Sequence, residues 1–299
     1  MNLSKKISNI IAYRSQALYY LLQFTRDFDA YTHQLGTQFL SDKVPANIKD
    51  EFHQLLGEFF PFWGDFLKET EDFRKKSTRV KGERQREFKP KKKYSEETHK
   101  YLFPYLEIAA KFVKYSGFLY SMVVTHSIAI FESFLSDFFT AIFTQRPNTL
   151  KSGNIATYED ILSFSSTKEL ISHLAMERTK KILEGDLQHD VAKKLNEIFS
   201  IDISRFDKFD IIYEAFCRRH IIVHNDGVTD NEYCRKVPNS RNNEYISTDL
   251  QYIETLLTTM GQIIDYLDGY FSRKMRYRRN PLVNKLLNPP DSVGGSKDS

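Results

Sequence analysis

The chain has 299 residues and a mass of 35.2 kDa, and with 41% hydrophobic and 14% aromatic residues it can bury a sizeable core. Glycine (12) and proline (9) are scarce, which argues against a loop-rich β-sandwich or barrel and against low-complexity disorder. Two cysteines cannot build a disulfide framework, so reduced thiols in a cytoplasmic protein are expected. The composition therefore predicts an all-α, cytoplasmic protein.

The net charge of +4 is unevenly distributed along the chain. Residues 74–93 contain eleven basic and two acidic side chains, and residues 271–299 contain seven and two, which leaves −10 for the remainder. An acidic body with two basic strips is typical of a protein that binds a polyanion. A solvated linker and a charged tail that only keep the protein soluble would show the same pattern.

Apolar residues recur at helical spacing over residues 7–22, and again from about residue 46 to 73 with a break or kink at Pro61. We expect these two helices to pair as an antiparallel hairpin that forms an N-terminal region, residues 1–73. The basic stretch 74–95 contains almost no apolar residues, which indicates a linker or loop and a domain boundary.

The helical pattern is stronger after Glu96. A nearly continuous helix is predicted over residues 101–143, with interruptions at Pro104 and Gly117. Its uncharged part, Tyr115 to Phe131, falls short of the ~20 apolar residues that a bilayer span needs, so a buried core helix explains it better than a membrane segment.

Shorter helices are predicted for the rest of the chain, over residues 157–164, 166–182, 189–199, 209–224 and 248–270. The helix at 209–224 should end at Gly227, because glycine tolerates positive φ. Ser247 or Thr248 is the expected N-cap of the last helix, and residues 244–247 are a candidate short extended piece. Together these helices predict one domain over residues 96–270, followed by a basic, partly disordered tail at 271–299.

The most informative segment is the helix that contains Arg218 and Arg219. Arg218 lies four residues after Glu214, which is a standard spacing for an ion pair on a helix surface. Arg219 has no such partner in its own helix and lies between two apolar faces, where an arginine is costly unless it occupies a cleft or meets an anion. His224 points about 140° away from Arg219 on a regular helix, so the two converge only if the helix frays at Asn225 or a second chain supplies the other half.

The run Arg219-His220-Ile221-Ile222-Val223-His224-Asn225-Asp226-Gly227 resembles the signature of the HEPN superfamily, an Arg followed by a polar residue and, further on, a His. Residues 125–139 resemble the long first helix of HEPN domains of the RiboL-PSP type, including Glu132 within an apolar run. Residues 157–164 resemble their middle region, and the resemblance covers roughly residues 100–270. It implies a HEPN-like helical bundle that follows the N-terminal hairpin.

The resemblance also implies an activity. HEPN ribonucleases need no metal or other cofactor, and they cut RNA at a site composed across a dimer, with one Arg–His pair from each protomer. The ribose 2′-OH attacks the phosphate, which leaves a 2′,3′-cyclic phosphate and a 5′-OH. His224 would then be the general acid or base and Arg219 the phosphate clamp. Supporting roles fall to His220, Asn225, Glu132 and Arg218, with Glu132 orienting an arginine, and the RNA backbone would follow Arg84, Arg86, Lys91, Lys92 and Lys93.

The expected function is therefore an RNA-cleaving toxin or antiviral effector of a bacterial defence (abortive infection) system, with RNA and a second copy of the chain as partners. Such an enzyme needs control, so an antitoxin or a phage-derived trigger is also expected. The alternative from a different class is a catalytically inactive HEPN module that binds RNA or a protein partner.

Two other interpretations apply to the same residues. Arg219 could form a salt bridge at the helix end, while His224 caps terminal carbonyl groups and His220 packs in a core. The two cysteines and two histidines at positions 217, 220, 224 and 234 could bind zinc, although they lack the usual paired C-x2-C knuckle and Arg218 and Arg219 would crowd a dication.

Overall fold

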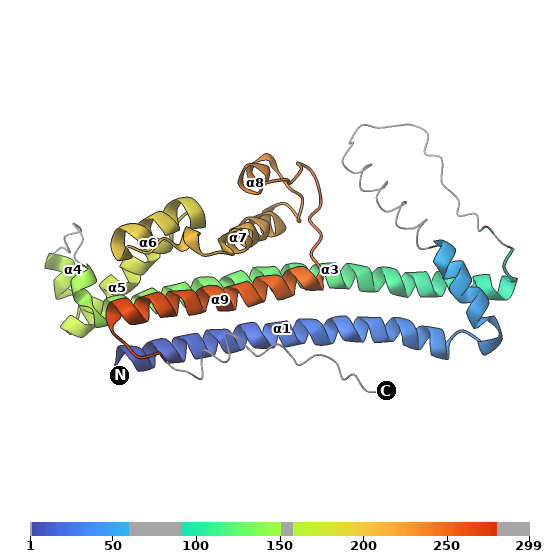
Figure 1. The fold of residues 1–299 in the computed structure, drawn as a ribbon, viewed down its shortest axis with the longest axis horizontal. Helices are drawn as coiled ribbons and strands as arrows, with labels where there is room; N and C mark the ends of the chain where they lie inside the picture. Colours follow the sequence, from blue (N-terminus) through green and yellow to red (C-terminus); the bar gives the residue numbers. More distant parts are fainter. Residues whose placement is uncertain (1, 60–90, 92, 151–157, 280–299) are drawn as a thin grey trace.

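The computed structural model describes residues 2–59, 91, 93–150 and 158–279, and the regular structure in these ranges is helical (Figure 1). In chain order the helices are α1 (Leu3–Asp42), α3 (Glu96–Gln145), α4 (Tyr158–Leu162), α5 (Thr167–Leu183), α6 (Ala192–Phe199), α7 (Phe209–His224), α8 (Asn231–Lys236) and α9 (Leu250–Met275). Residues 49–59 are also helical. Within the described ranges the only β pairing is an isolated antiparallel bridge between Val228 and Tyr245. The predicted all-α fold class is confirmed.

The long helices α1, α3 and α9 lie side by side and form the body of the molecule (Figure 1). The interruptions predicted at Pro104 and Gly117 are wrong, because α3 runs without a break for 50 residues. Pro104 lies inside the helix, where it cannot donate an i→i−4 hydrogen bond, but it is exposed and the helix continues past it; no atom crowds Gly117.

The main core joins α1 to the second half of the chain. Ile7, Ile11 and Leu18 are buried in the same apolar cluster as Phe134 and Phe138 of α3. The expected pairing of residues 7–22 with the following helix is therefore not what buries this face, because α3 and α9 cover it.

A second, smaller core lies at the other end of α3. Its buried members are Val44, Ile48, Phe52, Leu55, Leu56, Phe59, Tyr94 and Leu102. The Glu51 carboxylate joins the two chain segments, since it accepts hydrogen bonds from the Ser95 backbone N–H at 2.7 Å and from the Thr98 hydroxyl at 2.8 Å. Residues 60–90 lie outside the described part of the chain, so the kink at Pro61 and the linker at 74–95 remain predictions.

One segment among the described residues, Tyr115–Gln145 of α3, is long and apolar enough to cross a membrane by length and composition alone. Half of it is buried inside the protein, where it packs against α1, α5, α7 and α9. By length and composition the segment is thus longer than the predicted uncharged stretch, while its packing against four helices agrees with the predicted core helix.

Side chains cap the N-termini of several helices in the C-terminal half. Ser166 caps α5 by accepting the Glu169 backbone N–H. The N-cap of α9 is Asp249, whose carboxylate accepts the Tyr252 N–H at 2.7 Å, so the expected caps at 247 or 248 are off by one or two residues. These caps set the ends of the helices around α7, which carries the residues of interest.

Candidate functional site

Helix α7 covers residues 209–224, as the sequence predicted, and packs against α3 and α9. Its last turn is closed by two backbone N–H groups, from Asn225 and Gly227, that both donate to the Ile221 carbonyl. After the C-cap Asn225, both Asp226 (φ +50) and Gly227 (φ +78) adopt the left-handed conformation, which ends the helix and which glycine adopts without strain. The stop places His224 on the final helical turn, beside the groups described next.

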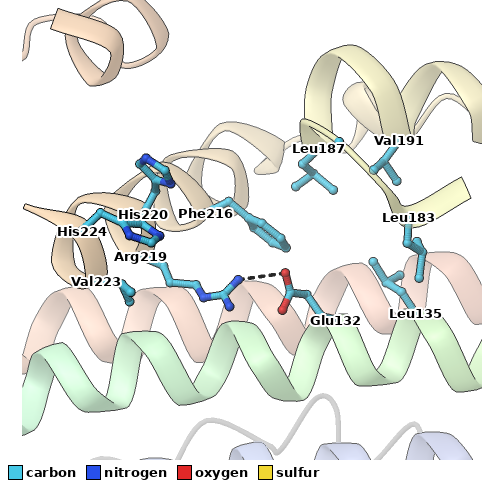
Figure 2. Close-up of a pocket in the computed structure, with 11 residues that line it drawn as sticks. Glu132, Leu135, Leu183, Leu187, Val191, Phe216, Arg219, His220, Val223 and His224 are labelled. Carbon is cyan, nitrogen blue, oxygen red and sulfur yellow. Dashed lines mark hydrogen bonds and ion pairs between the residues drawn. The ribbon is translucent and has the colours of Figure 1, made fainter. Parts of the chain in front are cut away.

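A cavity of about 400 Å³ lies between α7, α3 and the segment after α5. Its lining residues are Glu132, Leu135, Leu183, Gly185, Leu187, Val191, Phe216, Arg219, His220, Val223 and His224. Figure 2 shows the imidazoles and Arg219 at one end, together with Val223, and the leucines and Val191 at the other end. The volume is that of a site for a small molecule or a single nucleotide.

Arg219 extends from α7 to α3, where its Nη1 donates to the Glu132 Oε1 at 3.0 Å (Figure 2). The two side chains keep 37% and 43% of their surface exposed, so water still reaches both ends of the pair. Arg219 therefore has a carboxylate on one side and open cavity on the other. A guanidinium held in this way can bind a second anion through its remaining N–H groups.

His220 and His224 lie one helical turn apart, with ring centroids separated by 4.7 Å and ring planes tilted by 48°. Both are exposed, and both line the same cavity as Arg219. Arg219 and His224 project about 140° apart on an ideal helix, yet both line this cavity, and the Arg219 guanidinium extends toward Glu132 (Figure 2). One chain alone thus brings a guanidinium and two imidazoles to one cavity.

Arg218 faces the opposite side of α7 and does not line the cavity. Its Nε donates to Glu214 at 2.8 Å, which is the ion pair that the i, i+4 spacing predicted, and its guanidinium lies 4.1 Å from the ring centre of Tyr252. Glu214 also accepts the hydroxyls of Tyr233 and Tyr252, each at 2.6 Å. This network fixes α8 and α9 to α7 and is structural.

Asn225 lies just beyond α7 and outside the cavity lining. Its side-chain amide donates to the Asp230 Oδ2 at 3.0 Å, while Oδ1 of the same carboxylate accepts the Tyr233 backbone N–H at 2.7 Å and caps α8. The hydrogen bond to Tyr233 lowers the pKa of Asp230, so this carboxylate stays charged well into acid. Asn225 is thus part of the turn that holds the end of α7.

The apolar end of the cavity was not identified from the sequence. It is walled by one turn of π-helix, Leu187–Val191, which Asp186 begins by accepting the backbone N–H groups of Gln188 and His189. Gly185 precedes it with φ +106, a conformation that favours glycine. A single π-helical turn is too short to show a hydrophobic period in the sequence. The pair Gly185-Asp186 after a predicted helix is nevertheless typical of a bend in the chain.

The four candidate zinc ligands do not meet. Among the residues that the structure describes, no group of three His, Cys, Asp or Glu side chains is placed to hold a metal ion. Cys217 is buried, and burial raises the pKa of its thiol to about 11, which disfavours the thiolate that zinc binds.

The basic residues expected to follow RNA are only partly described. Lys91 and Lys93 are exposed at the end of α3 that lies far from the cavity, and the Lys91 backbone N–H donates to Glu58 at 2.7 Å. Lys92, Arg84 and Arg86 lie outside the described residues. The structure therefore does not join these lysines to the cavity as one surface.

Comparison with known proteins adds no relative, since the sequence matches no protein-family model, no curated protein and no solved structure. The chemistry of the cavity accordingly follows from its own side chains: a cation held by a carboxylate, two neighbouring imidazoles, and an apolar end.

Proposed function

We propose that the protein is a metal-independent endoribonuclease that cleaves RNA at the cavity on α7. The observation that carries the proposal is the convergence of Arg219, His220 and His224 on one cavity, with Glu132 holding the guanidinium. An arginine is the side chain best suited to bind a phosphate, and imidazoles are the groups that exchange protons near neutral pH. RNA supplies its own nucleophile, the 2′-OH, so this set of groups needs no metal.

In the proposed reaction the 2′ oxygen forms a bond to phosphorus as one imidazole takes the 2′-OH proton. The bond from phosphorus to the 5′ oxygen breaks, and a protonated imidazole donates its proton to that oxygen. The products are a 2′,3′-cyclic phosphate and a 5′-OH. Arg219 stabilises the charge that develops on the phosphate oxygens, and Glu132 keeps its guanidinium pointed into the cavity. His224 is the main acid or base, and in a dimer the second copy supplies a second Arg219–His224 pair.

The two ends of the cavity also suggest the form of the substrate. A phosphate at the charged end would place the adjoining nucleobase against Phe216 and the apolar end, walled by Leu183 and Leu187. A base can enter such a pocket only if it is unstacked and unpaired, and aromatic side chains are common platforms for bases of this kind. We therefore expect cleavage in single-stranded loops rather than within duplexes.

The direct test is an RNA cleavage assay in EDTA with the wild type, Arg219→Ala and His224→Ala. The matched controls are Arg205→Ala and His53→Ala, which remove an exposed arginine and an exposed histidine outside the cavity lining. We expect the wild type and both controls to leave cyclic phosphate ends, and both cavity variants to lose at least 100-fold in rate, since one acid or base contributes about 10²–10⁴. Equal rates in the wild type and His224→Ala would exclude the proposal.

The resemblance to HEPN toxins extends the proposal to a bacterial defence role with an antitoxin or a phage-derived trigger. Expression in a bacterial host tests it, because the wild type should stop growth while His224→Ala should not. One observation favours the alternative, a module that binds RNA or a protein without cleaving: Arg219 is already paired with Glu132. RNA binding that is the same in the wild type and His224→Ala, with no cleavage and no toxicity in either, would support that module instead.

A further inference from the structure

The outer face of α1 carries a regular row of large side chains. Its aromatic members are all more than half exposed: Tyr13 66%, Tyr20 60%, Phe24 53% and Tyr31 57%. The steps of seven, four and seven residues between them place all four within about 40° of one another on a helix. Ala17 and Asp27 lie between these aromatic residues and complete an unbroken 4-3-4-3-4 spacing. We call this set the α1 seam: Tyr13, Ala17, Tyr20, Phe24, Asp27 and Tyr31.

The seam lies on the other side of α1 from the core. Ile7, Ile11 and Leu18 point into the main core, and the seam is centred about 140° away from them around the helix axis. Helix α1 therefore has two apolar faces, of which α3 and α9 cover only one. An alternating 3–4 spacing is the pattern by which two helices pair as a coiled coil.

We propose that the α1 seam binds the α1 seam of a second copy of this chain, with the two helices antiparallel. The residues that flank the seam favour a second α1 seam as the partner, because only Arg14 among them is charged. The others are Gln16, Leu21, Gln23, Phe28 and Ala30. Arg14 is already ion-paired with Asp137 of α3 at 2.6 Å. Two such faces meet without the like-charge repulsion that keeps most helix surfaces apart.

Asp27 determines the orientation. In a parallel pair each seam residue faces its own copy, so two Asp27 carboxylates would oppose each other inside the contact, which is unfavourable. In an antiparallel pair centred near residue 22, Tyr13 faces Tyr31 of the second copy and Tyr20 faces its Phe24. Asp27 then faces Ala17, whose small side chain leaves the carboxylate room to remain hydrated.

The seam also offers enough surface for a specific contact. Aromatic side chains bury roughly 150–250 Å² each, so four rings that are more than half exposed on each of two copies supply on the order of 1,000 Å², near the lower limit for a specific interface. Before Tyr13 the register continues to Ile10 and then to Lys6, and after Tyr31 it continues to Gln34; Lys6 and Gln34 therefore confine the apolar contact to about residues 10–31.

This contact is separate from the cavity. Helix α1 packs on α3 and α9, while α7 lies on the other side of that layer in Figure 1. The inference therefore does not depend on the proposed ribonuclease activity, and it concerns a different surface from the one that would bring two α7 sites together.

The first test is the molar mass of the full chain in solution, measured by analytical ultracentrifugation across a concentration series. We expect the wild type to associate, Tyr20→Glu/Phe24→Glu to lose at least 100-fold in self-affinity, and Tyr19→Glu to behave like the wild type. Tyr19 is the matched control, because it is 46% exposed on the same helix but lies about 120° from the seam. A wild type that stays monomeric overturns the proposal, and so does a Tyr20→Glu/Phe24→Glu variant that associates normally. If the protein associates only after residues 280–299 are removed, the seam binds that tail and not a second copy, and this result also overturns the proposal.

The second test measures the orientation of the two α1 helices, and it detects only contacts between the two seams. Tyr13→Cys and Tyr31→Cys are made separately, each with Cys234→Ser, and treated with a short bis-maleimide alone and as a mixture. Antiparallel pairing predicts a cross-linked dimer in the mixture and little in either variant alone. Cross-linking of Tyr13→Cys with itself would show a parallel pair, and no cross-link in any sample would exclude the contact.

Discussion

Two consecutive arginines on α7 have opposite environments. The Arg218 side chain is 11% exposed and belongs to the network around Glu214, whereas Arg219 is 37% exposed and reaches into the cavity. The sequence distinguished the two, since only Arg218 has a glutamate four residues before it. Sequence spacing could not identify Glu132 as the partner of Arg219, because Glu132 lies 87 residues earlier and only the fold brings the two together.

This contrast predicts different costs for the two arginines. Arg218→Ala should lower the free energy of unfolding by about 3 kcal/mol, since it leaves the Glu214 carboxylate in a largely buried site without its cation. Arg219→Ala should change it by less than about 1 kcal/mol, because the pair with Glu132 is exposed to solvent. Urea denaturation of both variants measures the difference, and equal losses would contradict the structure.

The buried thiol of Cys217 predicts that the stability of the folded protein depends on pH. Burial raises the pKa of its thiol from an ordinary value of 9.0 to about 11, because the buried site disfavours the thiolate. The folded protein thus favours the neutral thiol. The resulting stability is fully present below pH 9 and is lost as the pH rises from 9 to about 11.

Alkylation with iodoacetamide at pH 8 in native buffer should therefore modify Cys234, which is half-buried, much faster than Cys217. Mass spectrometry of tryptic peptides gives the two rates, and denatured protein, in which both thiols should react alike, is the control. Rapid modification of Cys217 in the native protein would show that its site is open.

At the scale of elements, local signals predicted some helix ends but not others, since α9 begins after Asp249 and not after Ser247 or Thr248. The end of α7 before Gly227 was predicted from that glycine, and the helix expected at 166–182 begins one residue later, at Thr167, because Ser166 is its N-cap. Helix α8 was not predicted. It has only six residues, too few to show a period, and depends on the Asp230 cap and on the contact of Tyr233 with Glu214.

The turn at Gly185 predicts that a substitution of this glycine destabilises the protein. A Cβ built at this position would lie 2.8 Å from the Asp190 Cβ, and φ +106 is strained for any other residue. Gly185→Ala should therefore cost about 1–3 kcal/mol and displace the π-helical wall of the cavity. Thermal denaturation measures the cost, with the exposed Gly57→Ala, where a Cβ meets no atom, as a control that should leave the melting temperature unchanged or higher.

At the scale of the molecule, the sequence predicted the fold class but not the arrangement. Composition and helical periodicity are properties of single segments, and they cannot say that α1 shares a core with α3 and α9. The same limit applies to the cavity. Its polar residues were identified because they follow a recognisable motif, whereas its apolar end depends on contacts between α5, the π-helical turn and α3.

The shared core predicts that the N-terminal helix is not a separable addition. Ile11 is fully buried against the main cluster, so Ile11→Ala should cost about 2–5 kcal/mol and lower the melting temperature of the whole protein. Helix signals and tertiary signals should be lost together in circular dichroism at far- and near-ultraviolet wavelengths. Loss of α1 alone, with the rest of the protein melting at the wild-type temperature, would show that it is an independent unit.

The uninterrupted length of α3 has a mechanical consequence. Its 50 residues make a rod of about 75 Å, and Glu132 and Leu102 are separated along it by about 45 Å. Pivoted near Glu132, a tilt of only about 5° carries the end that holds the smaller core through about 4 Å. Because Glu132 lies at this pivot, the distant end can swing through that distance while the carboxylate stays within reach of Arg219.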